Sequence, residues 1–541
     1  MKTQESRTQK TVNFDQELDP EGAATRQAGV TRRSFMGGMG AMMAAGALAA
    51  IGGKSAFADE AEAEAEAEDA EAEEAEAAAT EEEAAAEDEA AASDDAEESG
   101  ASAFETLSIE STSGWTGTPE DVLALGVSTM PLDDLNAYRK AYLDVQTDYT
   151  CEDGTVVPAV FVKVHALTNT YGFGCRNTPA DECFDEILKA FTEDDAQAYI
   201  DMPMGVEFTP YEMAAEEGRT VEECEEICQR LAAAGYLSAS SHNRGEVYHQ
   251  VPPVFGSAEA RCFNSIIDDG VPISMPVTVE DMAVAGTPSL YYVPVDASVT
   301  SDGTILPYDD LKEKVKYANT VAIAPCICRY MAMVAAYGVD NIPSVEDFLT
   351  GEYEDYFSEV CNQRVETCIV TGDEAEYWIE QGYARQITGE QAADYLQRSI
   401  DDGFMLESSF EKNSEVICSC HVDSCGLTQL WMSLGDAEDI ASCNAFQQIS
   451  HYTLEVDTDL CIACGTCVDR CPLHIITIND EGWAEPGVDC FRCGQCAYVC
   501  PQNARHLVQR DESELAPMPT DILDQANVMG AYRFETGLIT L

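Results

Sequence analysis

Lysine and arginine are scarce in this chain of 541 residues, which carries 29 of them against 100 aspartates and glutamates and a net charge of −71. The deficit persists beyond residue 100, where 22 basic side chains stand against 74 acidic ones. A surface of this charge repels nucleic acid and anionic membrane surfaces. The composition therefore argues against a nucleic-acid partner and favours a protein partner with a positive patch.

Several sequence signals of catalysis are also missing. The chain has no C-x-x-C-H haem attachment site, no glycine-rich phosphate loop and no nucleophile elbow. Its seven histidines show no metal-ligand spacing, and His474 and His506, which follow cysteines, suit surface or supporting roles. No general acid, base or nucleophile can be named, so catalytic residues stay unassigned.

What the chain does have is cysteine, and eight of its 22 cysteines spell one motif twice. Each copy reads C-x2-C-x2-C-x3-C-P, the ligand pattern of two-cluster bacterial ferredoxins. The first copy comprises Cys461, Cys464, Cys467 and Cys471, and the second comprises Cys490, Cys493, Cys496 and Cys500. Structural zinc is the alternative, but zinc sites use two separated cysteine pairs rather than three thiolates in seven residues.

Residues 450–509 thus resemble the bacterial two-cluster ferredoxin domain. The resemblance implies crossed ligand sets, because the fourth cysteine of each copy reaches the other cluster. One [4Fe-4S] cluster would be held by Cys461, Cys464, Cys467 and Cys500, and the second by Cys490, Cys493, Cys496 and Cys471. Short strands are expected at 452–456, 475–478 and 482–485.

The N-terminal end of the chain predicts a targeting signal. Residues 1–58 contain Arg32-Arg33, a glycine-rich and alanine-rich apolar run, and the small-x-small sequence Ala56-Phe57-Ala58. This resembles a twin-arginine (Tat) signal peptide, which exports proteins already folded around a cofactor. The apolar run of about sixteen residues falls short of the roughly twenty that span a bilayer. Membrane contact is expected only through an uncleaved signal or through a partner.

An acidic segment at residues 59–103 follows the signal. It holds 21 acidic residues and no lysine or arginine, alternating mostly with alanine. Like charges four residues apart, such as Glu62 and Glu66, oppose a helix. The segment therefore predicts a disordered spacer between the signal and the folded part.

Residues 104–262 predict a helical and winged-helix-like domain. Thr209-Pro210 and the capping box Thr220–Glu223 begin two helices, and Asn243-Arg244-Gly245 marks the tip of a following hairpin. The second helix is acidic, which opposes DNA binding and favours a packing or docking module. Further helices are expected near residues 118, 133–145 and 181–191.

Residues 263–449 predict a cysteine-rich α+β domain with strands near 290–293 and 321–324. Its order of motifs, a C-x-C-R segment, two later cysteines and an I-C-x-C stretch, resembles a family of bacterial 4Fe-4S dicluster proteins. This resemblance covers roughly residues 155–510, although the last stretch holds fewer cysteines than is usual there. A third metal site is expected from among Cys326, Cys328, Cys361, Cys368, Cys418, Cys420 and Cys425.

The ligand set of this third site stays open. Cys326, Cys328, Cys418 and Cys420 could hold a third iron–sulfur cluster, with the other three as competitors. A zinc site and disulfides formed after export are the alternatives. The scattered cysteines suit buried apolar positions: Cys151, Cys175, Cys183, Cys224, Cys228, Cys262 and Cys443.

Together these features predict an α+β multidomain protein that ends in a 2[4Fe-4S] ferredoxin domain and a tail at 510–541. The expected function is that of an exported iron–sulfur electron-transfer protein, located in the periplasm or on the outer face of the cytoplasmic membrane, with redox protein partners. It would be a redox partner or subunit of an envelope oxidoreductase. Two alternatives are an enzyme of the reductive dehalogenase type, with a corrinoid, and an iron–sulfur winged-helix regulator.

Overall fold

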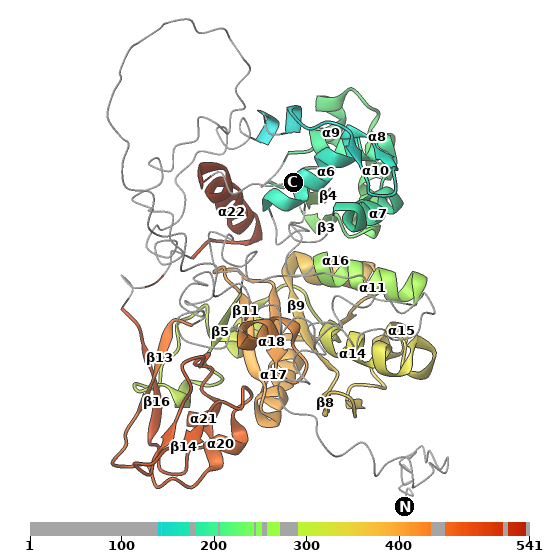
Figure 1. Ribbon diagram of the computed structural model, residues 1–541. Helices are drawn as coiled ribbons and strands as arrows, with labels where there is room; N and C mark the ends of the chain where they lie inside the picture. Colours follow the sequence, from blue (N-terminus) through green and yellow to red (C-terminus); the bar gives the residue numbers. More distant parts are fainter. Residues whose placement is uncertain are drawn as a thin grey trace, which may run out of the picture.

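Figure 1 shows the computed structural model of the chain. The structure describes residues 139–141, 143–171, 180–203, 206–242, 245–250, 257–270, 290–433, 450–511, 515 and 518–536. The predicted signal peptide, the acidic spacer and the helix expected near residue 118 lie outside these ranges, as do Cys175 and Cys443. Among the helices that are described, none combines the length and the apolar character needed to cross a bilayer.

The first folded part is mainly helical. A short strand pair, β1 (Tyr149–Thr150) and β2 (Val156–Val157), precedes three helices, α6 (Ala159–Tyr171), α7 (Ala180–Ala190) and α8 (Glu193–Asp201). Two further helices and a hairpin follow, comprising α9 (Pro210–Glu217), α10 (Val221–Ala233), β3 (Leu237–His242) and β4 (Gly245–Gln250). This confirms the predicted helix pair and hairpin, while their assignment to the winged-helix class stays a prediction.

Capping boxes explain where these helices begin. The hydroxyls of Thr209 and Thr220 accept hydrogen bonds from the backbone three residues on, and Glu212 and Glu223 bond back to the caps. On α10 the apolar side is buried, whereas its glutamates at 222, 223, 225 and 226 are exposed. The acidic surface expected for this helix is therefore present.

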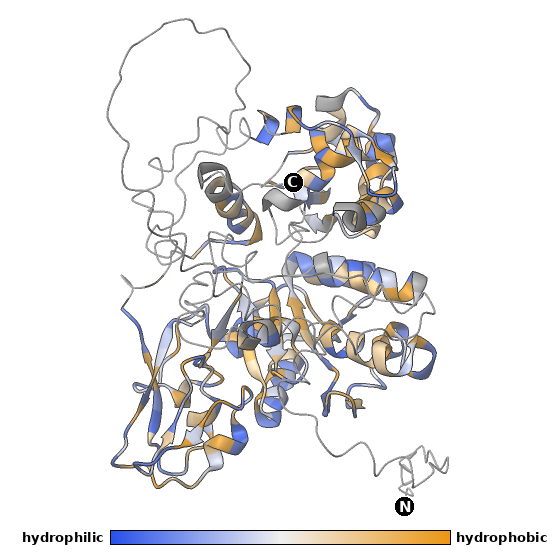
Figure 2. Ribbon diagram, viewed as in Figure 1, coloured by the Kyte–Doolittle hydropathy of each residue, from blue (hydrophilic) through white to orange (hydrophobic). Residues whose placement is uncertain are grey.

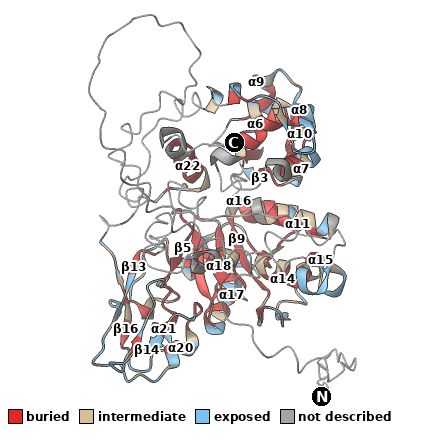
Figure 3. Cartoon of the chain, viewed as in Figure 1, coloured by how far each residue is buried: buried red, intermediate tan, exposed pale blue. Residues whose placement is uncertain are grey.

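A six-stranded antiparallel sheet forms the centre of the middle part. Its strand order is β10-β6-β9-β12-β11-β5. The strands are β5 (Leu290–Val293), β6 (Val321–Pro325), β9 (Glu366–Thr371), β10 (Arg385–Gln386), β11 (Met405–Ser409) and β12 (Val416–Cys420). Figures 2 and 3 show apolar, buried residues gathered on these strands. The mixed helix and sheet architecture predicted for this region is confirmed.

Helices cover both faces of the sheet, and its strands are therefore buried on both sides. Ile323, Ile369 and Ile417 share a core with residues of α13 (Leu311–Tyr317) and α17 (Gly389–Asp402). Ala324 and Cys368 belong to a second core with residues of α14 (Ile327–Tyr337) and α16 (Gly372–Glu380). The remaining elements of this part are α11 (Ser257–Asp269), η3 (Ala297–Val299), η4 (Val339–Asn341), α15 (Val345–Leu349), β7 (Phe357–Ser358), β8 (Gln363–Arg364) and α18 (Gly426–Ser433).

The cysteine-repeat unit, residues 450–511, comes next. Strand β13 (Tyr452–Val456) pairs with β16 (Arg505–Gln509), and the predicted hairpin is present as the two-residue strands β14 (Thr477–Ile478) and β15 (Ala484–Glu485). Short helices α20 (Thr466–Arg470) and α21 (Gln495–Tyr498) carry cysteines of the two motifs. The predicted tail contains a helix, α22 (Ile522–Thr536), which packs against α6.

This unit is fastened to the end of α17. The Arg470 guanidinium donates hydrogen bonds to the carbonyl groups of Ile400 and Asp401, and Gln495 donates to those of Ile400 and Phe404. A cation near a helix C-terminus also interacts favourably with the helix dipole. These contacts hold the cysteine motifs against the sheet.

Two neighbouring glutamates, the buried Glu374 of α16 and the half-buried Glu415, predict a pH dependence of stability. Burial, followed by the charge of Glu415, raises the pKa of Glu374 to about 8, and burial and nearby acidic groups raise the pKa of Glu415 to about 8. Between about pH 4.5 and pH 8 the unfolded chain therefore binds fewer protons than the folded chain, so the free energy of unfolding falls as the pH rises.

We expect the substitution Glu374→Gln to increase the free energy of unfolding at pH 8 by about 1–3 kcal/mol and to leave it nearly unchanged at pH 4.5. Glutamine keeps an acceptor for the Trp378 indole, which now lies 2.5 Å from Glu374 Oε1. Urea titrations at the two pH values measure the difference. An equal gain at both would show that charge at this site is not the cause.

Candidate metal centres

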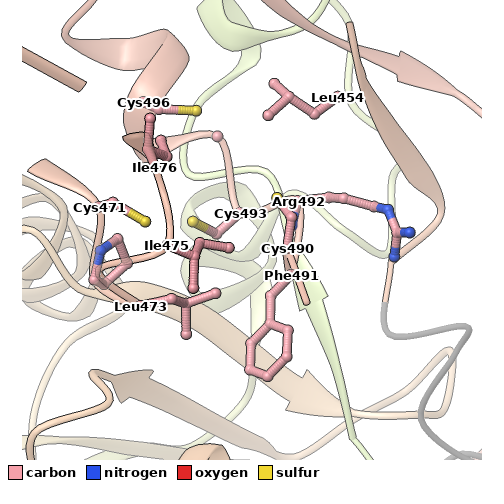
Figure 4. A pocket seen from close by; sticks show the side chains of 12 residues that line it. Leu454, Cys471, Leu473, Ile475, Ile476, Cys490, Phe491, Arg492, Cys493 and Cys496 are labelled. Carbon is pink, nitrogen blue, oxygen red and sulfur yellow. The ribbon is translucent and has the colours of Figure 1, made fainter. Parts of the chain in front are cut away.

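The second cysteine motif and one cysteine of the first line a single cavity. Cys490, Cys493 and Cys496 contribute from the second motif, and Cys471 from the first. Figure 4 shows the sulfurs of Cys471 and Cys493 directed toward one another, with Cys496 on the adjoining helix. The rest of the lining is largely apolar and includes Leu454, Leu473, Ile475, Ile476 and Phe491. These four thiols are the crossed set expected from the sequence.

The backbone of the two motifs repeats as the sequence does. Ala463 and Arg492 occupy equivalent positions and have φ values of 51° and 56°, and the glycines that follow the second cysteines have 82° and 86°. Left-handed residues at these points turn the chain sharply enough to bring successive cysteines to one side. The same sharp turn is therefore built into both motifs.

Backbone amides and a buried cation surround these sulfurs. Amide groups of Ala484, Arg492 and Ala504 donate to the sulfurs of Cys461, Cys490 and Cys500 at 3.5, 3.4 and 3.3 Å. Arg505, which is 2% exposed, donates to Cys496 Sγ at 3.6 Å. Burial raises the pKa of Cys467, and the charge of Arg505 opposes that rise. Arg505 therefore favours thiolates in both motifs.

Cys464 is the most accessible cysteine of the unit. It is exposed, whereas Cys467 is buried and Cys461 and Cys500 are half-buried. A hydrogen bond with Thr466 lowers the pKa of Cys464. The first motif thus lies closer to solvent than the cavity that holds Cys493 and Cys496.

Six of the seven middle cysteines meet in one group, in which Cys368, Cys420 and Cys425 are buried and the other three are half-buried. Cys326 caps α14, Cys328 lies in its first turn, and Cys368 lies on β9. Cys418 and Cys420 alternate along β12, and Cys425 directly precedes α18. We call this set the six-thiol cluster.

Hydrogen bonds connect its members in the order 368, 418, 420, 425, 328, 326. These bonds are the largest cause of the pKa shifts, which alternate along the series. They raise the pKa of Cys328, Cys368 and Cys420 and lower the pKa of Cys326, Cys418 and Cys425. Thiols that lie within hydrogen-bonding range of one another suit thiolate ligands of a shared metal centre.

Cys361 does not belong to this series. Its thiol is hydrogen-bonded to Ser358, and burial raises its pKa. Cys326 and Arg329 lie close enough to affect the pKa as well. The structure therefore places Cys361 beside the six-thiol cluster rather than within it.

Arg329 is a buried cation whose function the sequence did not reveal. It has no exposed surface, and its guanidinium donates to Gln363, Thr367 and the carbonyl group of Ser419. Among the described residues, no carboxylate forms an ion pair with it. Its charge lowers the pKa of Cys326 and Cys418. A buried cation with only neutral partners fits an anionic thiolate centre beside it.

Glu407 is a second residue near the thiols that was not predicted from the sequence. It lies on β11 directly between Cys418 on β12 and Tyr292 on β5, so the three side chains share one face of the sheet. Burial, followed by the nearby thiols of Cys425 and Cys418, raises the pKa of Glu407. The available signal was a glutamate directly after the apolar segment Phe404-Met405-Leu406, at a position that an ordinary core strand gives to an apolar residue.

The six-thiol cluster and the cysteine-repeat unit share an apolar core. Cys420 and Cys425 belong to the same group of buried side chains as Cys471, Cys493 and Cys496. The rings of Tyr292 and Phe491 stack within it, with centroids 4.5 Å apart. The amide group of Val422 donates to the Pro472 carbonyl group at 3.2 Å. No layer of solvent separates these two sets of thiols at this contact.

The other cysteines suit a structural role where they are described. Cys224, Cys228 and Cys262 are buried in the apolar core, as expected, and Cys151 is half-buried. Cys228 Sγ lies 3.8 Å from Met213 Sδ. The side chain of Cys183 lies outside the described part. His474 is half-exposed and contacts His421 edge to face, whereas His506 lies on β16.

Comparisons with known proteins concern the cysteine-repeat unit. Residues 454–477 match the family model of the 4Fe-4S binding domain. The chain is 53% identical over 30 residues to a probable ferredoxin of Methanosarcina thermophila, and 56% identical over 34 residues to a ferredoxin of Moorella thermoacetica. Each alignment covers 6% of this chain and 52% of the relative, so the chain spans about half the length of these relatives. No solved structure matches the chain.

The matched segment contains the whole first motif. Its spacing and its amide-to-sulfur contacts fit the thiolate ligation of a 4Fe-4S cluster. The predicted iron–sulfur segment is therefore confirmed for at least one cluster, which supports a role in electron transfer. The second cluster, the ligand sets and the destination of the chain stay predictions.

Proposed function

We propose that the chain is an exported electron-transfer protein with two [4Fe-4S] clusters in the cysteine-repeat unit and a third iron–sulfur centre in the six-thiol cluster. When bound, such clusters accept and release single electrons. The observation that carries this proposal is the apolar core shared by Cys420 and Cys425 with Cys471, Cys493 and Cys496. It supports electron transfer within the chain, from one set of thiolates to the other.

The residues around the thiolates would set the potentials. Arg505 and Arg329 supply buried positive charge that favours an added electron, whereas the strongly acidic surface opposes it. The exposed Cys464 makes the first motif the side at which a redox protein partner would exchange electrons. A partner with a positive patch is the electrostatic complement of this chain.

Export accounts for the twin-arginine segment and for the acidic spacer that follows it. The Tat route suits a protein whose clusters are inserted before transport. The envelope oxidoreductase to which this chain would deliver electrons is part of the same proposal. If cell fractionation recovers the protein only in the cytoplasm, the export part of this proposal is wrong.

The test of the third centre is iron and acid-labile sulfide per chain, on protein purified without oxygen. We expect about twelve irons, and about eight in a chain with both Cys326→Ser and Cys328→Ser, because four irons belong to each cube. Cys224→Ser and Cys228→Ser together form the matched control, since these buried cysteines lie on α10 and are not members of the six-thiol cluster. About eight irons in every sample would show that the six-thiol cluster holds no iron–sulfur centre.

A further inference from the structure

Glu407 and two members of the six-thiol cluster, Cys420 and Cys425, form a compact group. The ligand atoms of Glu407, Cys420 and Cys425 all lie within 4.8 Å of one another, and all three residues are buried. Cys420 Sγ lies 2.9 Å from Glu407 Oε2, and the thiols of Cys420 and Cys425 are hydrogen-bonded. The group comes from two neighbouring strands and the start of α18.

The six-thiol cluster has more sulfur than one cube requires. A [4Fe-4S] cluster takes four thiolates, so two of the six are in surplus. The other four members, Cys326, Cys328, Cys368 and Cys418, form the two ends of the series and come from the start of α14, β9 and β12. Cys420 and Cys425 are adjacent in the series and are the two that approach a carboxylate.

We propose that Glu407, Cys420 and Cys425 bind a single divalent transition metal, iron(II) or zinc(II), beside a cube held by Cys326, Cys328, Cys368 and Cys418. The inference deepens the proposed function, since it rests on a third cluster occupying the rest of the same site. The four-cysteine set differs from the one favoured by sequence, because Cys368 replaces Cys420.

The distances suit a single ion. Tetrahedral bonds of about 2.0–2.3 Å to oxygen and sulfur place the ligand atoms roughly 3.3–3.8 Å apart. The 2.9 Å and 4.8 Å limits of this group bracket that range, so only small side-chain adjustments are needed. Two thiolates and a carboxylate suit borderline metals such as zinc(II) and iron(II).

The charge of the ligands is a second reason to expect a divalent cation at this site. Among the described residues no basic side chain pairs with Glu407, and Arg329 is directed to Gln363, Thr367 and Ser419. A divalent cation would offset the negative charge that the carboxylate and the two thiolates bring as ligands to this apolar surrounding.

Three protein ligands leave a fourth position open, an arrangement typical of catalytic rather than structural metal sites. The hydroxyls of Tyr292 and Thr428 lie 3.2 Å apart, and Tyr292 is also hydrogen-bonded to Glu407. These polar groups suit a water molecule or a small anion as the fourth ligand. Because the site shares its core with Cys471 and Cys493, such a ligand would lie close to a source of electrons.

The experiment is elemental analysis of the full chain, purified without oxygen, for iron, zinc, cobalt, nickel and manganese. We expect one metal per chain beyond the iron of three cubes, hence about thirteen irons or about twelve irons and one zinc. Glu407→Gln and Cys425→Ser should each remove that one metal and retain about twelve irons. Mössbauer spectroscopy would distinguish a lone iron(II) from cluster iron.

Glu411→Gln is the matched control, because Glu411 is also buried, with its pKa raised to about 7 by burial, but it contacts no thiol among the described residues. Loss of about four irons in Glu407→Gln or Cys425→Ser would overturn the inference, since these residues would then serve the cube. Retention of all metal in both variants would overturn it too. The absence of a third cube would be recognised by a different result, because the iron content would then be unchanged in the chain with both Cys326→Ser and Cys328→Ser.

Discussion

A chain carrying both Cys471→Ser and Cys490→Ser should contain no less iron than a chain carrying Cys490→Ser alone. Each single substitution is expected to remove about four irons, because one missing thiolate opens a cube. Cys471 and Cys490 line the same cavity although they belong to different motifs. If both serve one cluster, the second substitution has nothing further to remove.

The contrasting pair is Cys471→Ser with Cys461→Ser. These cysteines belong to the same motif, but crossed ligation assigns them to different cubes, so this double variant should lose about eight irons. Iron and sulfide analysis of the unsubstituted chain, the three single variants and the two double variants forms two double-mutant cycles, in which non-additivity identifies shared ligands. The reverse result, with additive loss for 471 and 490 and none beyond four irons for 461 and 471, would mean that each motif holds its own cluster.

Replacement of Arg329 by methionine should damage the middle centre and spare the cysteine-repeat unit. Methionine fills much of the same volume but removes the buried charge and the three hydrogen-bonded contacts to Gln363, Thr367 and Ser419. The expected loss in the free energy of unfolding is about 3–5 kcal/mol, since buried anionic thiolates lose their cation. Any middle cluster that survives should have a lower reduction potential, because negative surroundings oppose an added electron.

Arg385→Met is the control for this substitution. Arg385 is also largely buried and forms an ion pair with Glu366 at 2.8 Å, so its loss should cost comparable stability without changing iron content. Redox titration followed by electron paramagnetic resonance reports each centre, and urea unfolding reports stability. Equal iron content and unaltered potentials in Arg329→Met would show that this cation serves the fold alone.

Local signals in the sequence were reliable where a few neighbouring residues determine the structure. The boxes at Thr209 and Thr220 begin helices as expected, since the hydroxyl and the carboxylate that close each box lie three residues apart. The hairpin at β3 and β4 follows for the same reason. By contrast, helix α22 in the predicted tail has little amphipathic pattern of its own and packs against the distant α6.

Local signals were not sufficient to predict the six-thiol cluster and the residues around it. Cys326 and Cys328 could be recognised as candidates, but Cys368 and Cys361 were equivalent in the sequence, and only the fold brings the first into the six-thiol cluster and leaves the second beside it. Glu407 carried a weak signal as a charged residue in an apolar strand. Arg329 was visible in its motif, yet nothing in the sequence indicated that its partners would all be neutral.

The sequence by itself determined the eight thiols of the repeated motif and the acidic surface, because each depends on residue type and on spacing along a short stretch. Only the tertiary structure decided which cysteines meet across motifs and which side chains join the six-thiol cluster. The register of β9, β12, β11 and β5 places Cys368, Cys418, Glu407 and Tyr292 side by side, and that register is set by pairing between strands far apart in the chain. A one-residue shift of β11 would turn Glu407 to the opposite face, which is why ligand identity could be predicted locally and ligand assembly could not.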